Sequence, residues 1–145
     1  MSDLRQDGVD EIFKRLGPFL NTGEIEDILS WPKDGVPDLD KIPCCIVLEG
    51  DDIIIKRATS NGLGYPVTRR LTVIVETWVN EETDVRALER VLKAGVLGQI
   101  NAGGRLVNGV TIMEGKTVGP VDGGIPNMIG MRTFYELTYK DHGPY

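Results

Sequence analysis

The stretch of sequence that decides the fold is VTRRLTVIVETWVN, which runs from Val67 to Asn80. Its composition alternates from one residue to the next, as expected for a strand whose successive side chains point to opposite faces of a sheet. At ~3.3 Å per residue it would span about 43 Å, so we expect part of it to bend or to project beyond the core. One face carries Arg69, Leu71, Val73, Val75, Thr77 and Val79, and the other carries Thr68, Arg70, Thr72, Ile74, Glu76 and Trp78.

Three further segments have the composition of strands. The apolar run Cys44–Leu48 is typical of a buried strand, and Ile53–Ile55 either continues it or forms a brief second strand. Leu106–Ile112 contains an Asn-Gly pair, which favours the tight turn of a β-hairpin. Ile129–Lys140 alternates again and predicts a closing strand.

An amphipathic helix is predicted at residues 1–20. Ser2 or Asp3 can cap its start, and Gly17-Pro18 is expected to stop it. Glu24 to Trp31 could add a short helical turn before Pro32. The apolar stripe of the helix consists of Val9, Ile12, Phe13, Leu16 and Leu20.

A second helix is predicted from Asp84 to Leu97. Asn80 or Thr83 is expected to cap it, and the acidic residues around its start suit the positive end of the helix dipole. Its expected buried stripe consists of Val85, Leu88, Val91 and Leu92.

These elements predict an α+β fold: a mainly antiparallel sheet of about four strands plus a hairpin, with two main helices packed on one face. The chain is expected to be a single domain over residues 1–145, with the helix at 1–20, a sheet-and-helix core at 43–140 and a tail at 141–145. The Gly- and Pro-rich segments Arg57–Pro66 and Lys116–Asn127 are expected to be loops. The helix-free face of the sheet, with Ile74, Trp78 and Phe134, is either a subunit interface or covered by short segments of the same chain.

The charge of the chain is acidic and uneven. The formal net charge is −6, and residues 1–52 carry 13 acids and 5 bases whereas residues 53–145 carry 9 acids and 11 bases. An acidic chain repels phosphate, so a dedicated DNA-wrapping or membrane-surface role is not expected. No transmembrane helix and no secretory signal are expected, and the adjacent pair Cys44-Cys45 fits buried structural thiols in a reducing compartment.

The residue types of common catalytic sites are sparse. The one histidine, His142, makes catalytic triads and His-rich zinc sites unexpected. The segment Gly109–Thr117 imitates a phosphate-binding loop, but five residues separate its glycines where the motif has four, and no helix is expected after Lys116. Glu49, Asp51 and Asp52 could hold magnesium at a strand end, which leaves a small metal-dependent nuclease as one alternative; a solvated acidic turn is the simpler interpretation.

The pattern as a whole resembles the tail terminator, or tail completion, proteins of long-tailed bacteriophages. The resemblance lies in the order and spacing of elements and in the way the strands begin and end. The matching features are the helix Leu4–Phe19, the Ile42-Pro43 entry into Cys44–Leu48, the strand Arg69–Val79, the helix Asp84–Leu97 and the strand Arg132–Lys140, which ends in FYELTY.

The resemblance implies a structural role without catalytic residues or cofactors. Members of this family form a hexameric ring at the head-proximal end of the tail tube, stop tube polymerisation and offer a surface to the head connector. Such a protein would be made in the bacterial host cytoplasm and would end in the virion, at the neck end of the tail. Its implied partners are further copies of itself, the tail tube protein and the connector proteins, with no membrane and with double-stranded DNA passing through the lumen without sequence-specific binding.

The candidate contact residues for subunits or tube are taken from the helix-free face and the two loops. They are Arg57, Tyr65, Arg70, Ile74, Trp78, Lys116, Arg132 and Phe134. A head-completion or neck protein of the connector is the nearest alternative function, because such proteins are also small and form rings. A small-molecule-binding regulatory module is a further alternative, although no pocket residues stand out in the sequence.

Overall fold

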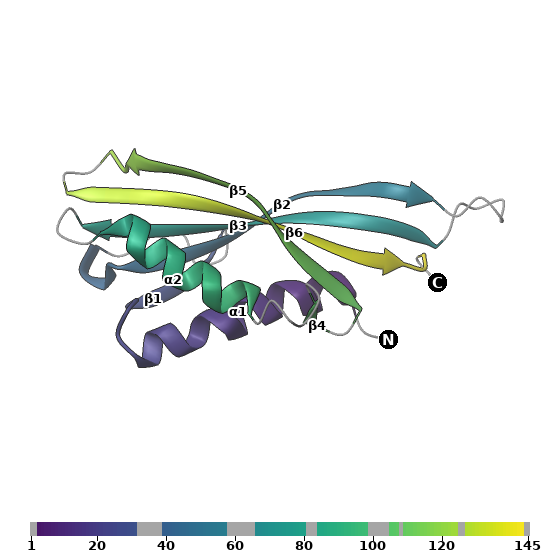
Figure 1. Cartoon of the computed structure of the whole chain (residues 1–145), viewed down its shortest axis with the longest axis horizontal. Coiled ribbons are helices and arrows are strands. Elements are labelled where there is room, and N and C mark those ends of the chain that lie inside the picture. Colours follow the sequence, from purple (N-terminus) through teal and green to yellow (C-terminus); the bar gives the residue numbers. More distant parts are fainter. Residues whose placement is uncertain are drawn as a thin grey trace.

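The computed structural model describes residues 3–31, 39–57, 66–80, 84–98, 105–107, 109–124 and 127–143. It is an α+β fold in which two helices lie on one face of a six-stranded sheet (Figure 1). No described helix is long and apolar enough to cross a membrane. The elements are α1 (Leu4–Asn21), β1 (Asp27–Ser30), a 3-10 turn (Leu39–Lys41), β2 (Cys44–Arg57), β3 (Val67–Asn80), α2 (Val85–Leu97), β4 (Arg105–Val107), β5 (Val110–Asp122) and β6 (Met128–Asp141).

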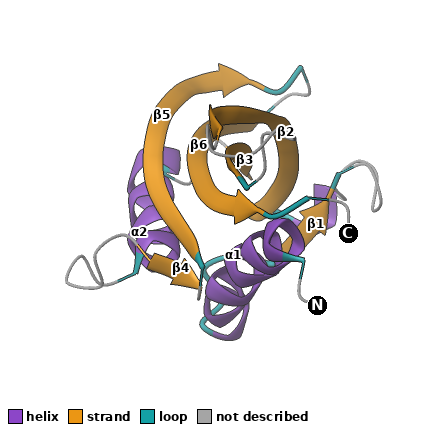
Figure 2. Cartoon of the chain, turned by 90° about the vertical axis from the view of Figure 1, so that its right-hand side faces the viewer, coloured by secondary structure: helices purple, strands orange, loops and turns teal. Residues whose placement is uncertain are grey.

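The stretch Val67–Asn80 forms β3, near the middle of the sheet. The strand order is β1-β2-β3-β6-β5-β4, and β3 pairs with β6 along its whole length, from Val67 opposite Asp141 to Asn80 opposite Met128. The long strands twist strongly, so that β2 and β6 curl around β3 when viewed along the strands (Figure 2). The expected length of β3 is thus accommodated by twist, because adjacent strands rotate relative to one another.

The sheet is larger and more mixed than the sequence predicts, because β1 joins it as a parallel strand. We expected a helical turn within Glu24–Trp31, and this prediction is wrong. Gly23, at φ 79°, turns the chain away from α1, and residues 27–30 then lie extended beside β2, with Asp27 opposite Cys44. A backbone partner along β2 satisfies the N–H and C=O groups that an isolated helical turn would leave open.

Two strands are longer than predicted. Residues 53–55 continue β2 after a register shift between Glu49 and Asp52, which decides between the two options left open by the sequence. Residues 116–122, expected to be a loop, belong to β5, with register shifts between Glu114 and Lys116 and again between Val118 and Val121. These shifts, and the position of β5 at the edge of the sheet past its short pairing with β4, accommodate glycines and a proline within a strand.

The first helix begins where predicted and ends later. Asp3 is its N-cap and accepts a hydrogen bond from the backbone N–H of Gln6 at 3.2 Å. The predicted stop at Gly17-Pro18 is wrong, because α1 continues to Asn21. Proline removes only one backbone donor near the end of the helix, and its carbonyl still accepts from the N–H of Thr22 at 3.1 Å.

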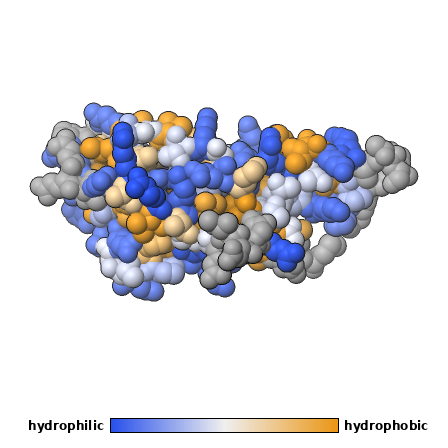
Figure 3. Space-filling view, viewed as in Figure 1, coloured by the Kyte–Doolittle hydropathy of each residue, from blue (hydrophilic) through white to orange (hydrophobic). Residues whose placement is uncertain are grey.

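The second helix differs from the prediction in its cap and in its buried stripe. Its N-cap is Asp84, whose carboxylate accepts from two backbone N–H groups of the first turn; Asn80 does not cap it, and Thr83 lies outside the described residues. The buried residues are Val85, Glu89, Leu92 and Val96, whereas Leu88 is half-buried and Val91 is 46% exposed. Hydrophobic and hydrophilic residues consequently lie side by side on the surface over α2 (Figure 3).

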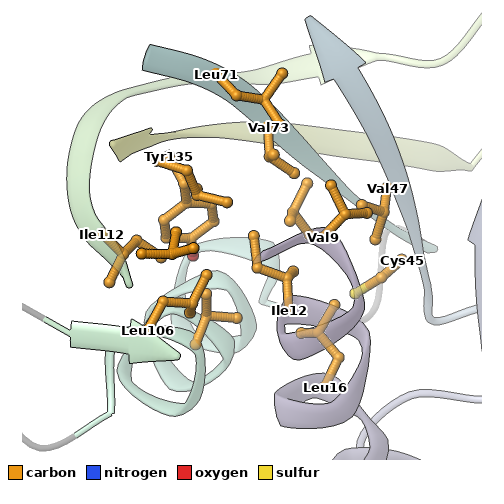
Figure 4. Packing of buried hydrophobic residues seen from close by; sticks show 14 of the residues in the cluster. Val9, Ile12, Leu16, Cys45, Val47, Leu71, Val73, Leu106, Ile112 and Tyr135 are labelled. Atoms are coloured by element: carbon orange, nitrogen blue, oxygen red, sulfur yellow. The ribbon is translucent and has the colours of Figure 1, made fainter. Parts of the chain in front are cut away.

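The main core lies between the helices and one face of the sheet (Figure 4). Ile12 and Leu16 of α1 are fully buried there against strand residues that include Val73 and Tyr135. Arg15 joins three elements at the border of the core, because its guanidinium donates to the carbonyl of Val96 at 2.8 Å and to that of Leu106 at 2.6 Å. The helices therefore cover one face of the sheet and leave the other to solvent or to partners.

Candidate assembly surface

The face of the sheet opposite the helices, here called the helix-free face, carries most of the residues selected from the sequence. In β3 the odd-numbered residues from Leu71 to Val79 are buried against the helix side, so the even-numbered residues point away from it. The predicted residues that share this helix-free face are Arg70, Ile74 and Trp78 of β3, Lys116 of β5, and Arg132 and Phe134 of β6. Of the other two, Arg57 is exposed at the end of β2 and Tyr65 lies outside the described residues.

The apolar centre of this face is a cross-strand pair. Ile74 lies directly opposite Phe134 in the register of β3 and β6, and both are half-buried. The ammonium group of Lys116 lies 4.7 Å from the centroid of the Phe134 ring, a cation–π contact. An aliphatic side chain, an aromatic ring and a cation therefore meet on one open surface.

Trp78 lies further along β3 and packs on glycines. A Cβ atom at Gly130 would lie 2.6 Å from the indole ring, and one at Gly123 would lie 2.8 Å from it. These two glycines leave the space that the ring occupies. The indole N–H donates to the Glu76 carboxylate at 3.2 Å, so the orientation of the ring is also fixed by a hydrogen bond.

The charged groups of the helix-free face are largely paired with one another. Arg132 donates to Glu76 at 2.6 Å, although the carboxylate is only 11% exposed and the arginine 51%. Glu136 accepts from the Thr72 hydroxyl at 3.1 Å and lies 3.6 Å from the Arg70 guanidinium. Because these pairs balance charge locally, the face offers directed polar contacts without a strong net attraction for phosphate.

A shallow hollow of about 520 Å³ opens on this face between four strands. Among the described residues, no cluster of three or more potential ligand side chains could hold a metal ion. Gly50 and Gly115 border the hollow, and side chains there would crowd the backbone of β3 and β6. Its lining consists of Gly50, Asp51, Thr72, Ile74, Gly115, Lys116, Phe134 and Glu136.

No family model matches this chain, and no curated protein matches it. Its fold is similar to that of a chain in the virion of a native gene transfer agent (GTA) particle. The TM-score is 0.56 at 9% sequence identity, and the match covers 90% of this chain and 92% of the other. The two chains therefore share a fold across nearly their whole lengths.

The acidic residues considered for magnesium are divided between the two faces of β2. Arg5 of α1 contacts Glu49 at 3.1 Å and Asp52 at 3.0 Å. Asp52 also accepts from the Tyr139 hydroxyl at 2.5 Å, and burial together with this bond raises the pKa of that tyrosine. Asp51 instead borders the hollow on the helix-free face. Glu49 and Asp52 therefore bind α1 to the sheet through their ion pairs with Arg5.

Exposed apolar residues on β5 were missed by the sequence analysis. Met113 is 62% exposed, and Val118 and Val121 are 39% and 38% exposed. Val118 and Val121 fall within the expected loop at 116–127, and Met113 falls between that loop and the expected hairpin at 106–112. In the sheet, Met113 and Val118 lie opposite Glu136 and Arg132. A strand assignment for residues 113–122 places all three at the border of the helix-free face.

Proposed function

We propose that this chain is a structural component of a phage-like virion, and within it a tail terminator that caps the tail tube at its head-proximal end. The observation that carries the proposal is the helix-free face, a wide mixed surface centred on Ile74 and Phe134 that no described segment covers. The fold shared with a chain of the GTA virion supports a virion role. The resemblance in element order to tail terminators supports the more specific one.

A terminator of this size requires several copies. A chain of 145 residues has a radius of gyration of about 15 Å when compact, which is too small for a single copy to close a tube that DNA traverses. Head-to-tail contacts between identical subunits close into a ring by rotation. We therefore propose a ring, hexameric as in the family that the sequence resembles, with DNA passing through its lumen.

The helix-free face is proposed as the contact to a second virion protein, either the tail tube or the head connector. Its aromatic centre and its rim of paired charges resemble the composition of wet, specific protein interfaces. Lys116 and Phe134 border a hollow into which a side chain of the partner can insert. This role requires binding and shape, and it requires no catalytic group.

The proposal is tested by deleting the gene in the phage or particle-producing strain that carries it. We expect tail tubes that exceed their set length, with few of them joined to heads. Tubes of normal length that fail to join heads would instead indicate a head-completion or neck protein. Normal tails joined to heads in the absence of the chain would contradict both roles.

Complementation with point variants tests the proposed contact face. The double variant Lys116→Ala/Phe134→Ala removes the cation–π pair and should restore fewer joined particles than the wild type. Lys14→Ala, at an exposed lysine of α1 on the opposite side of the sheet, is the matched control and should complement fully. Thermal unfolding of each purified variant separates loss of binding from loss of folding. Full complementation by a folded double variant would remove this face from the interface.

A further inference from the structure

We infer that the copies in the proposed ring contact one another through two opposite sides of the chain, the exposed side of α2 and the side that carries β1. The existence of the ring rests on the proposed function, and the inference identifies the surfaces through which neighbouring copies contact one another. It leaves the helix-free face available for the tube or the connector.

The exposed side of α2, here called the α2 side, combines a small apolar stripe with two arginines. Val91 is 46% exposed, and Ala87 and Ala94 lie one turn to either side of it on the same stripe. Arg86 and Arg90 lie beside this stripe, and among the described residues neither has an ion-pair partner. The surface is therefore apolar at its centre and basic at its border.

Other charges of α2 do not cancel these arginines. Glu89 is buried and contacts Lys93 at 3.1 Å, and Lys93 also contacts Glu114 of β5 at 2.8 Å. Asp84 is exposed, and its negative charge lies at the positive end of the helix dipole, where the carboxylate accepts from two backbone N–H groups of the first helical turn. The α2 side consequently attracts an acidic partner surface.

The opposite side, here called the β1 side, has the complementary composition. Trp31 is 47% exposed and Leu20 is 40% exposed. Glu24 and Glu26 are exposed between them in the chain, and neither has an ion-pair partner among the residues that the structure describes. The two acids precede the start of β1 and Trp31 follows its end, so this side combines an aromatic anchor with unpaired acidic residues.

The placement of the two sides allows a ring. Figure 2 shows α2 and β1 on opposite sides of the molecule, with α1 between them. A contact between different surfaces of identical subunits can repeat from copy to copy and close by rotation. A symmetric contact of two α2 sides would instead bring four arginines together, and one of two β1 sides would bring four glutamates together. Like charges oppose both symmetric contacts, so charge selects the head-to-tail arrangement.

Charge reversal on the purified chain tests the contact. The α2-reversed variant is Arg86→Glu/Arg90→Glu, and the β1-reversed variant is Glu24→Arg/Glu26→Arg. Sedimentation velocity over a range of protein concentrations at low salt, where charges are least screened, measures self-association. The matched control is Lys56→Glu/Lys140→Glu, which changes the net charge as the α2-reversed variant does but at exposed positions near the ends of β2 and β6.

We expect the wild type and the control to self-associate at low salt and to dissociate as salt is added. Each reversed variant alone should associate at least about tenfold more weakly, which corresponds to 1.4 kcal/mol. An equimolar mixture of the two variants should recover association, because each reversed side then meets an oppositely charged side of the other variant. The quadruple variant should recover it for the same reason.

Three outcomes would overturn the inference. They are a wild-type chain that stays monomeric at low salt, a reversed variant that associates as tightly as the wild type, and a mixture that fails to recover association. The gene deletion can still give overlong tails that fail to join heads, whichever of these outcomes is observed. Failure of the contact is thus distinguishable from failure of the proposed function.

Discussion

The environment of Trp78 shows how single residues shape the helix-free face. The indole ring packs against Gly130 of β6 and against Gly123, which follows the end of β5. Its N–H is directed to Glu76, which is in turn paired with Arg132. A large aromatic residue is thus accommodated on a sheet face because two neighbours lack side chains.

Replacing Gly130 by Ala should destabilise the protein by about 1–3 kcal/mol, because the added methyl group overlaps the indole ring. The matched control is Gly17→Ala in α1, where a Cβ atom meets nothing within 4 Å. That change should stabilise the helix by about 0.5–1 kcal/mol, since alanine is the better helix former. Urea unfolding measures both free energies, and equal effects of the two changes would contradict the packing described for Trp78.

The two cysteines should be unreactive in the folded protein. Burial raises the pKa of Cys44 to about 11 and that of Cys45 to about 12, from a reference value of 9.0. The reactive thiolate is correspondingly rare at neutral pH, so a thiol reagent should react at least about 100-fold more slowly with the native than with the urea-unfolded chain. Rapid titration of either thiol in the native protein would show that its strand opens readily.

The same shifts predict the direction of a pH effect on stability. A folded pKa above the unfolded one means that the unfolded chain releases its proton first as the pH rises. The stabilisation is fully present below about pH 9 and is lost as the pH approaches about 11–12. The free energy of unfolding, measured by urea titration, should fall across this window, and a constant value would contradict the buried thiols.

At the scale of elements, α2 shows what periodicity can and cannot assign. The helix itself and the burial of Val85 and Leu92 follow from the sequence. The predicted stripe is wrong at Val91, which is exposed, and it does not contain Glu89, which is buried. Glu89 pairs with Lys93 one turn along the same helix, and it accepts from the hydroxyl of Thr133 in β6 at 2.7 Å. The second contact joins distant segments, so no local pattern contains it.

Leu92→Ala should cost about 2–4 kcal/mol, because the side chain is only 2% exposed and its removal leaves a cavity. Val91→Ala on the next position should cost less than about 0.5 kcal/mol, since that side chain faces solvent in the single chain. Thermal or urea unfolding at low protein concentration compares the two. A large cost at Val91 would show that α2 is rotated from the described position.

The ion pair of Glu89 and Lys93 provides a second test of how α2 is docked. Lys93→Met leaves a buried carboxylate without its cation and should cost about 2 kcal/mol, less than for a fully buried pair because Lys93 is 20% exposed. The double variant Glu89→Leu/Lys93→Met removes both charges and should recover part of that loss. If the double variant is no more stable than Lys93→Met, the buried carboxylate is not the source of the cost.

The strands illustrate the same limit of local patterns. The alternation in Val67–Asn80 and Ile129–Lys140 predicts β3 and β6 and the face on which each side chain lies. The pattern does not predict β1 or the second half of β5, because glycine, proline and short polar segments become strands only when a neighbouring strand supplies their backbone partners. The candidate residues on β3 and β6, and Lys116 of β5, therefore follow from the sequence, whereas the exposed apolar residues Met113, Val118 and Val121 of β5 do not.

At the scale of the whole molecule, the chain offers three distinct surfaces. The helix-free face lies opposite the helices, and the α2 and β1 sides lie on opposite flanks (Figures 1 and 2). A ring subunit needs two complementary flanks for its neighbours and at least one further surface for the structure that it caps. The fold provides these three surfaces: the α2 side and the β1 side for neighbouring copies, and the helix-free face for the tube or the connector.

The most direct test of the central claim is a reconstruction by cryo-electron microscopy of the intact particle that carries this chain. We predict density for a ring of six copies at the junction of tail tube and head, with the helix-free face against the tube or the connector. Particles in which that junction is built from other proteins, with this chain absent or placed elsewhere, would contradict the account.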